Sequence, residues 1–163
     1  MRYQFRLHPM DRTVAPPFTL TADDGTEAKL ESFRGQWVLL LFYPRDFSPV
    51  CTEQLCHYRD EWEALELPGV RVFGISPDTV ERHREFRRRY AIPFPLLADP
   101  QQEVFRRYGM VTLGLLPARG VVVVDPEGIV RYRWKSSLGL RYPKAGELRS
   151  LLLRLQAGGA PRE

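Results

Sequence analysis

The sequence predicts a three-layer α/β fold, in which a mixed β-sheet lies between helices. Short apolar, strand-like runs alternate along the chain with amphipathic segments of helical spacing, and one hairpin comes late. The run 37–43, WVLLLFY, has no polar interruption, which is typical of a strand buried on both faces of a sheet. The chain has 163 residues, 44% of them hydrophobic, enough for a single domain with a sizeable core.

The individual elements follow from turn residues and apolar spacing. Strands are predicted where short apolar runs lie between Gly, Pro or Asp residues: 18–20, 27–30, 37–43, 70–76, 94–98, 120–124 and 129–134. Helices are predicted where apolar residues recur every three or four positions: 49–65, 79–90, 101–108 and 145–155. The remaining segments read as a short helical turn or loop (31–35) and as loops (110–118 and 138–143).

The ends of the chain differ in pattern from the middle. Residues 1–14 read as an N-terminal tail before Pro16 and Pro17, which block regular structure. We expect the folded domain to span 15–156 and residues 157–163 to form a flexible C-terminus.

Two cysteines stand close together after the first long apolar run. Ser48 is a suitable N-cap residue and Pro49 suits the first position of a helix, because it has no N–H group to leave unpaired. Cys51 then occupies the third helical position, where unpaired N–H groups and the positive end of the helix dipole favour a thiolate.

Cys51 and Cys56 cannot form a disulfide within an intact helix. Residues five positions apart are separated by ~7.5 Å along the helix axis and by ~140° around it, whereas a disulfide needs Cα atoms within ~7 Å and facing Cβ atoms. We expect oxidation to unwind the first turns of this helix. Buried cysteines are often chemically inert, and the residues alone leave both interpretations open.

The segment 44–52, PRDFSPVCT, resembles the active-site signature of the peroxiredoxins, P-x-x-x-[T/S]-x-x-C. The second cysteine, five residues after the first, is similar to that of the Q-type subgroup, also called bacterioferritin comigratory protein. Weaker similarities continue in the same order from about residue 15 to residue 153. The resemblance implies a thioredoxin-like fold with an N-terminal β-hairpin.

The resemblance also implies a reaction for the two thiols. Cys51 matches the peroxidatic cysteine, which attacks a peroxide and becomes a sulfenic acid. Cys56 matches the resolving cysteine, which condenses with that sulfenic acid to an intramolecular disulfide. The implied enzyme reduces hydrogen peroxide and organic hydroperoxides, is recycled by thioredoxin or a similar dithiol reductant, and uses no metal or organic cofactor.

Four further residues match functional positions of the family. Ser48 matches the hydroxyl that hydrogen-bonds peroxide and thiolate, and Pro44 the proline that shields the thiolate from water. Arg119 matches the arginine that stabilises the thiolate and the charge developing on oxygen. Gln54 matches a position that supports this arginine.

Three positions depart from the family pattern. Ser48 stands where Thr is more frequent, Val50 where the Q-type subgroup often has Gly, and Gly120 where Ser or Thr usually follows the arginine. We expect these departures to tune the rate or the peroxide preference.

Composition and charge exclude other classes of function. The net charge of +4 is spread over basic residues interleaved with acids, so we expect no nucleic-acid partner. No run approaches the ~18 apolar residues of a membrane span, and the first ten residues lack the apolar core of a secretory signal. We therefore expect a cytoplasmic protein without a membrane partner, and a monomer rather than a dimer, because the resolving cysteine lies in the same chain.

Two other functions remain open at this point. A thioredoxin-fold copper assembly protein could bind metal through Cys51, Cys56 and a histidine, His57 or His83. Such proteins have three residues between their cysteines and are usually membrane-tethered, whereas this chain has four. On the apolar stripe of its helix, His83 is expected to be packed and hydrogen-bonded instead. A scaffold or chaperone role independent of both thiols is the third hypothesis.

Two polar clusters are expected to be structural. The arginines within 82–89 alternate with Glu81 and Glu85, which predicts ion pairs on the helix surface. Ser76 and Asp78 follow a strand and are expected to form a strand-to-helix cap.

Overall fold

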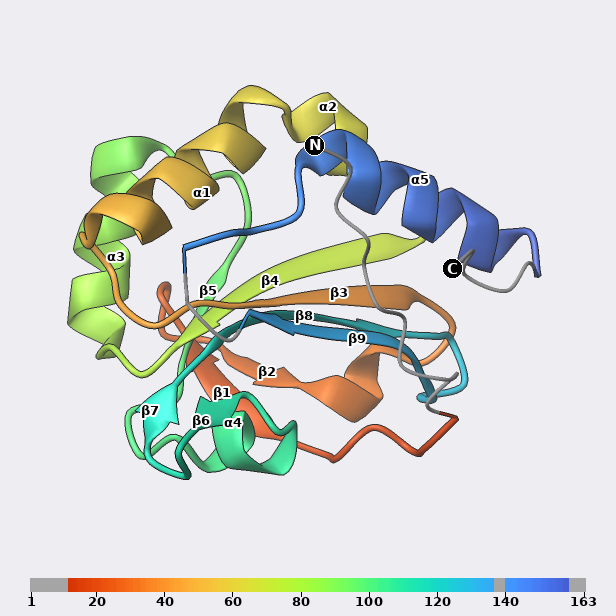
Figure 1. Cartoon of the computed structure of the whole chain (residues 1–163), viewed down its shortest axis with the longest axis horizontal. Helices are drawn as coiled ribbons and strands as arrows, with labels where there is room; N and C mark the ends of the chain where they lie inside the picture. Colours follow the sequence, from red (N-terminus) through yellow and green to blue (C-terminus); the bar gives the residue numbers. More distant parts are fainter. Residues whose placement is uncertain (1–11, 137–139, 159–163) are drawn as a thin grey trace.

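A seven-stranded mixed sheet in the order β2-β1-β5-β4-β3-β8-β9 forms the centre of the protein in a computed structural model that describes residues 12–136 and 140–158 (Figure 1). Its strands are β1 Thr19–Ala22, β2 Glu27–Lys29, β3 Trp37–Phe42, β4 Val70–Ser76, β5 Leu96–Ala98, β8 Arg119–Val124 and β9 Val130–Ser136. Strands β3, β4 and β5 are parallel to one another, and the other neighbouring pairs are antiparallel. The predicted mixed sheet and the N-terminal hairpin are confirmed.

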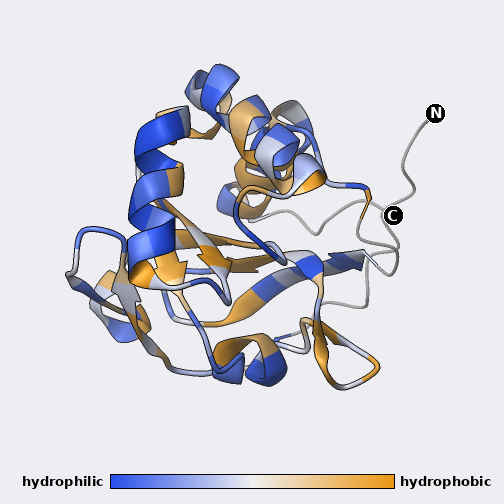
Figure 2. Cartoon of the chain, turned by 90° about the vertical axis from the view of Figure 1, so that its left-hand side faces the viewer, coloured by the Kyte–Doolittle hydropathy of each residue, from blue (hydrophilic) through white to orange (hydrophobic). Residues whose placement is uncertain are grey.

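Helices cover both faces of this sheet. Four helices pack on one face: α1 Pro49–Asp60, α2 Trp62–Leu65, α3 Val80–Tyr90 and α5 Ala145–Gln156 (Figure 1). The 3-10 turn Leu30–Phe33 and helix α4 Glu103–Arg107 pack on the other face. Their outer surfaces are hydrophilic, while hydrophobic residues concentrate along the sheet (Figure 2). The predicted three-layer arrangement is therefore confirmed.

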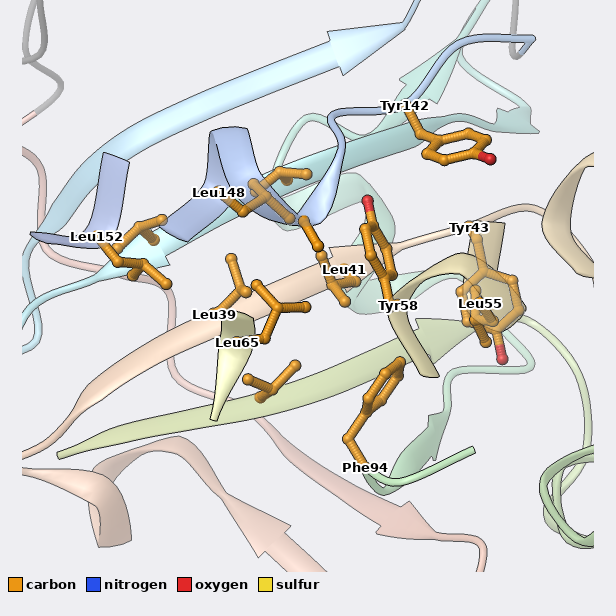
Figure 3. Close-up of a cluster of buried hydrophobic side chains, with 14 of the residues drawn as sticks. Leu39, Leu41, Tyr43, Leu55, Tyr58, Leu65, Phe94, Tyr142, Leu148 and Leu152 are labelled. Atoms are coloured by element: carbon orange, nitrogen blue, oxygen red, sulfur yellow. The ribbon is translucent and has the colours of Figure 1, made fainter. Parts of the chain in front are cut away.

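Strand β3 supplies alternate residues to two separate cores. Leu39 and Leu41 point to the helices α1, α2 and α5, where they meet Leu65, Leu148 and the neighbouring leucines (Figure 3). The intervening residues of β3 point to the core on the opposite face. All of the strand after its first residue is buried, as the unbroken apolar run predicts.

The sheet brings two distant segments to the same edge. Strand β8 runs antiparallel to β3, with Phe42 opposite Gly120. Arg119, the first residue of β8, therefore lies at the edge where β3 ends and the chain turns towards α1.

Several predicted boundaries are wrong in detail. The helix predicted over 49–65 breaks at Glu61, and the short α2 that follows packs Trp62 against Phe94 at 5.7 Å between ring centroids. Helix α4 begins at Glu103 rather than 101, because the Asp99 carboxylate accepts the N–H groups of Glu103 and Phe105.

Two further segments differ from prediction. The loop predicted over 110–118 contains a small hairpin of β6 Val111–Thr112 and β7 Leu116–Pro117. The strand predicted over 94–98 is shorter and begins only after Pro95, which has no N–H group to donate to a sheet.

The described part of the predicted tail is tied to the late hairpin. The N–H group of Val130 donates to the Thr13 carbonyl at 2.9 Å, and that of Ala15 donates to the Gly128 carbonyl at 2.8 Å. The rest of the predicted tail, the first part of the 138–143 loop and most of the predicted flexible C-terminus lie outside the described residues. Within the described residues, no helix is both long and apolar enough to cross a membrane.

Candidate active site

Cys51 occupies the third position of α1, as the sequence predicts. The helix begins at Pro49, and the N–H group of Thr52 donates to the Ser48 carbonyl at 2.9 Å, which is the first helical hydrogen bond. The thiol is 1% exposed and belongs to the core between the sheet and the helices. The N–H groups of the first turn have no helical acceptor and point towards this end of the helix.

The predicted cap at Ser48 is correct in position but wrong in its hydrogen bond. Ser48 is the residue preceding the helix, with extended backbone, yet its side chain does not cap the helix. Its hydroxyl instead donates to the Arg45 carbonyl at 3.0 Å, which closes the loop before the helix.

Arg119 lies directly against the Cys51 thiol, although 68 residues separate the two in the sequence. Its Nη2 donates to Cys51 Sγ at 3.2 Å, and its Nη1 donates to Gln54 Oε1. Both side chains are almost completely buried. A buried guanidinium beside the sulfur stabilises negative charge there, because little water is present to screen it.

Gln54 connects this arginine to a second buried polar group. Its Nε2 donates to the Tyr58 hydroxyl at 3.2 Å, and that hydroxyl donates to the Pro143 carbonyl at 2.7 Å. Burial raises the pKa of Tyr58, so its hydroxyl keeps the proton that it donates. The chain of bonds fixes the Gln54 amide towards Arg119, which fits the supporting role expected for Gln54.

The packing around residue 120 explains why this chain has glycine after Arg119. A Cβ atom at this position would lie 2.7 Å from the Trp134 carbonyl oxygen and would overlap the sulfur of Met110. The space that a larger residue after Arg119 would need is thus filled by Met110.

The loop before α1 contains a buried polar group that sequence reasoning missed. Asp46 is 0% exposed, accepts a hydrogen bond from the Tyr43 hydroxyl at 2.6 Å, and lies 2.6 Å from His83 Nδ1. The prediction that His83 is packed and hydrogen-bonded is confirmed. The partner could not be identified from spacing, because Asp46 stands in a polar turn 37 residues away.

The polar residues around α3 have different partners from those predicted. Thr79, rather than Ser76 and Asp78, caps the helix, since its hydroxyl accepts the Arg82 N–H at 3.2 Å. Asp78 instead accepts the N–H group of Asp46 at 2.6 Å.

The ion pairs of the arginine cluster also differ from the expected ones. Arg82 pairs with Asp78 at 3.2 Å and Arg87 pairs with Asp23 at 3.1 Å. Both partners lie outside the helix, so these two arginines connect α3 to other elements instead of pairing with Glu81 and Glu85.

Cys56 lies five residues, about one and a half turns, further along the same helix and is half-buried, with a free thiol. Desolvation by burial raises the pKa of this thiol, and the nearby Asp60 carboxylate adds to the shift. Because α1 is continuous from Pro49 to Asp60, the two thiols stand on different sides of an intact helix.

The remaining predicted residues occupy the rim of the site or are engaged elsewhere. Pro44 is partly exposed at the start of the loop that leads to α1. His57 accepts the N–H group of Ala145 at 3.0 Å through Nε2. Within residues 12–136 and 140–158, no group of three or more His, Cys, Asp or Glu side chains is placed to hold a metal ion.

Comparison with known proteins agrees with this arrangement. Residues 12–133 match the model of the AhpC/TSA family. The chain is 37% identical over 129 residues to a protein of Coxiella burnetii named putative peroxiredoxin bcp, covering 74% of this chain and 84% of that protein. This chain belongs to the peroxiredoxins. Its relatives place it in the Q-type group, also called bacterioferritin comigratory protein, as the sequence resemblance predicts.

Two other peroxiredoxins extend the comparison. The chain is 40% identical over 122 residues to peroxiredoxin Q, chloroplastic, of Oryza sativa subsp. japonica, covering 74% of this chain but only 56% of that relative's length. The crystal structure of the peroxidoxin BcpB from Mycobacterium tuberculosis aligns with a TM-score of 0.75 at 28% identity, covering 92% of this chain and 98% of that one. The thioredoxin-like fold of this peroxiredoxin is confirmed.

Proposed function

We propose that this peroxiredoxin is a thiol-dependent peroxidase that reduces hydrogen peroxide and organic hydroperoxides at Cys51. The observation that carries the proposal is the Arg119 guanidinium 3.2 Å from a buried thiol at a helix N-terminus. In the first step the Cys51 thiolate attacks one peroxide oxygen and the O–O bond breaks. The sulfur becomes a sulfenic acid, and the leaving oxygen takes a proton and departs as water or an alcohol.

Arg119 is suited to stabilise the transition state of this step. Its guanidinium faces the sulfur, and negative charge moves from sulfur to the leaving oxygen as the O–O bond breaks. We assign to Ser48 a hydrogen bond to the peroxide, which requires its hydroxyl to rotate away from the Arg45 carbonyl. Pro44, at the start of the same loop, shields the thiolate from water.

Cys56 resolves the sulfenic acid in the second step. Its thiol gives up its proton, its sulfur attacks the Cys51 sulfur, and the S–O bond breaks to leave a disulfide and water. The two sulfurs meet only if the first turns of α1 unwind. A dithiol protein of the thioredoxin type then supplies two electrons and two protons. We propose that the enzyme is cytoplasmic. We also propose that it is a monomer, since both cysteines belong to one chain.

Peroxide consumption coupled to thioredoxin tests this function. Cys51→Ser should abolish turnover. Cys56→Ser should still consume the first equivalent of peroxide, but should be reduced slowly by thioredoxin and overoxidise more readily. Tight one-to-one copper binding by the wild-type protein without peroxide turnover would instead support the assembly-protein alternative.

The proposed unwinding has a test of its own. Circular dichroism and hydrogen exchange of reduced and oxidised protein should differ, with protection lost in the first turns of α1 on oxidation. Identical profiles in the two states would exclude the unwinding step.

A further inference from the structure

The loop 44–48, which leads from β3 to the Cys51 helix, contains Asp46, whose carboxylate pairs with His83 of α3 in a contact that the proposed chemistry does not use. The Asp46 carboxylate and the His83 imidazole are both 0% exposed, and Oδ2 of Asp46 lies 2.6 Å from Nδ1 of His83. The second carboxylate oxygen accepts the Tyr43 hydroxyl at 2.6 Å. A buried carboxylate is costly unless it is paired and hydrogen-bonded in this way, so these contacts must form together.

Polar groups enclose both ring nitrogens of His83. Its Nε2 is 3.2 Å from the Leu97 carbonyl oxygen and 3.4 Å from the Ser76 hydroxyl. Its Nδ1 faces the Asp46 carboxylate, so that contact is a hydrogen bond to a charged group. The Nδ1–Oδ2 contact is therefore a charge-assisted hydrogen bond, which is stronger than a neutral one and sensitive to the loss of either partner.

The pair is connected to Cys51 through a strained backbone. The N–H group of Asp46 donates to Asp78, and its carbonyl accepts from Arg82 at 3.4 Å. The next residue, Phe47, has a left-handed φ of 63°, which costs energy in a non-glycine residue. Its ring packs against Phe86 at 5.0 Å and beneath the Arg82 guanidinium at 5.1 Å. The turn that directs the chain into α1 is thus held in place by contacts with α3 and the residues before it.

We propose that Asp46 and His83 act together as positioning residues that keep Cys51 in its peroxide-reactive place. The inference rests on the proposed function, because it concerns the balance between the two steps of that reaction. The first step needs Cys51 folded against Arg119, while the second needs the first turns of α1 unwound. A loop fixed by Asp46 and His83 favours the first arrangement and returns the chain to it after each cycle.

The substitution Asp46→Asn tests this role, because it preserves shape and removes the charge of the pair. In a Cys56→Ser background, where the sulfenic acid persists, stopped-flow kinetics isolate the first step. We expect its second-order rate constant to fall by about ten- to a hundredfold, the loss typical of a small displacement of a reacting group. With Cys56 present, the single-turnover rate of disulfide formation should be unchanged or higher, and overoxidation should decrease.

A double-mutant cycle tests whether the two residues act as one unit. His83→Gln should lower the first-step rate constant in the same direction as Asp46→Asn. The double variant should lose little more than the worse single variant, because either change already breaks the pair. Additive losses would overturn the inference.

A matched pair of tyrosines separates positioning from general destabilisation. Tyr43 and Tyr108 are both 0% exposed, and each donates one hydrogen bond, to Asp46 at 2.6 Å and to the Pro16 carbonyl at 2.7 Å. Tyr43→Phe and Tyr108→Phe should both lower the midpoint of urea unfolding. Only Tyr43→Phe should change the ratio of the rate constant for sulfenic acid formation to that for disulfide formation. This comparison stands even if Asp46→Asn fails to fold.

Failure of this inference differs from failure of the proposed function. If Cys51→Ser still turned over peroxide, the proposed function would be wrong. The positioning role alone would be excluded by a different outcome. In that case wild type would behave as proposed, but Asp46→Asn and Tyr43→Phe would show the same ratio of sulfenic acid formation to disulfide formation as Tyr108→Phe.

Discussion

The segments on either side of Cys51 are held in different ways. Before the thiol, the loop is bound to α3 through Asp46 and His83, a charge-assisted contact of 2.6 Å between groups with no exposed surface. After the thiol, the helix is bound to residues 143–145 through neutral bonds. Tyr58 donates to the Pro143 carbonyl, and His57 accepts from the N–H group of Ala145.

This difference indicates which contacts can open during a catalytic cycle. Neutral hydrogen bonds are each worth about 1 kcal/mol net, and those to charged groups about 1.5–3 kcal/mol. The contacts of Tyr58 and His57 with residues 143–145 therefore cost less to break than the Asp46 contact, while Gln54 and Arg59 add charged hydrogen bonds on the same side, with Arg119 and with the Tyr90 carbonyl. The thiol thus lies between a fixed segment, the loop 44–48, and the part of α1 that follows Cys51, which we call the releasable segment.

Arg119 contacts both the thiol and the releasable segment, so removing its guanidinium should have the largest effect. Arg119→Met keeps much of the apolar length but loses the donors to Cys51 and Gln54. We expect the rate constant for sulfenic acid formation to fall by about 10²–10³, as for other donors that stabilise transition-state charge. Stopped-flow measurement in the Cys56→Ser background checks this.

The control for this substitution is Arg131→Met. Arg131 pairs with Asp125, just beyond the opposite end of β8 from Arg119, and should leave the rate within twofold of wild type. Equal losses in the two variants would mean that Arg119 acts on stability and not on the reacting sulfur.

Tyr58→Phe should weaken the releasable segment at a site that acts on the thiol only indirectly, through Gln54 and Arg119. The change removes the hydroxyl that joins Gln54 to the Pro143 carbonyl. A loss of about 1 kcal/mol from the folded helix corresponds to about a fivefold larger unwound population, so disulfide formation should be about fivefold faster. Single-turnover oxidation, monitored through the loss of free thiol, measures the rate of disulfide formation.

Tyr108→Phe again serves as the matched control, because its hydroxyl binds Pro16 on the opposite face of the sheet. Slower disulfide formation in Tyr58→Phe, or equal acceleration in both variants, would contradict the picture of a releasable segment after Cys51.

Local sequence patterns predicted the parts of the molecule that depend on near neighbours. The unbroken run of β3 and the Ser48-Pro49 start of α1 correctly placed a buried strand and a thiol in the third helical position. Arg119 was expected only through family resemblance, because its contact with Cys51 arises from the pairing of β3 with β8. The Cys51–Cys56 reaction itself stays a prediction.

The contacts that could not be predicted depend on chain folding over long separations. Asp46 looked like an ordinary turn residue, since nothing in its neighbourhood marks a histidine 37 residues away as its partner. The split of the predicted helix at Glu61 and the arginine partners on α3 were missed for the same reason, because packing and not periodicity decides them.

The smallest expected effect is a dependence of stability on pH through His57. Burial lowers the pKa of His57 below its usual 6.5, and the charge of Lys144 lowers it further. Neutral His57 accepts the N–H group of Ala145. The unfolded chain thus binds a proton more readily than the folded one, so the stabilising contribution is complete above about pH 6.5 and is lost as the pH falls below it.

His57→Gln isolates this contribution, because an amide oxygen can accept the same N–H group at every pH. Urea unfolding at intervals between pH 5 and pH 8 should show wild type losing more stability on acidification than the variant. The difference should be small, since the ring is only partly buried. Parallel curves would show that His57 does not titrate against the start of α5, and that acid does not loosen the segment after Cys51 through this contact.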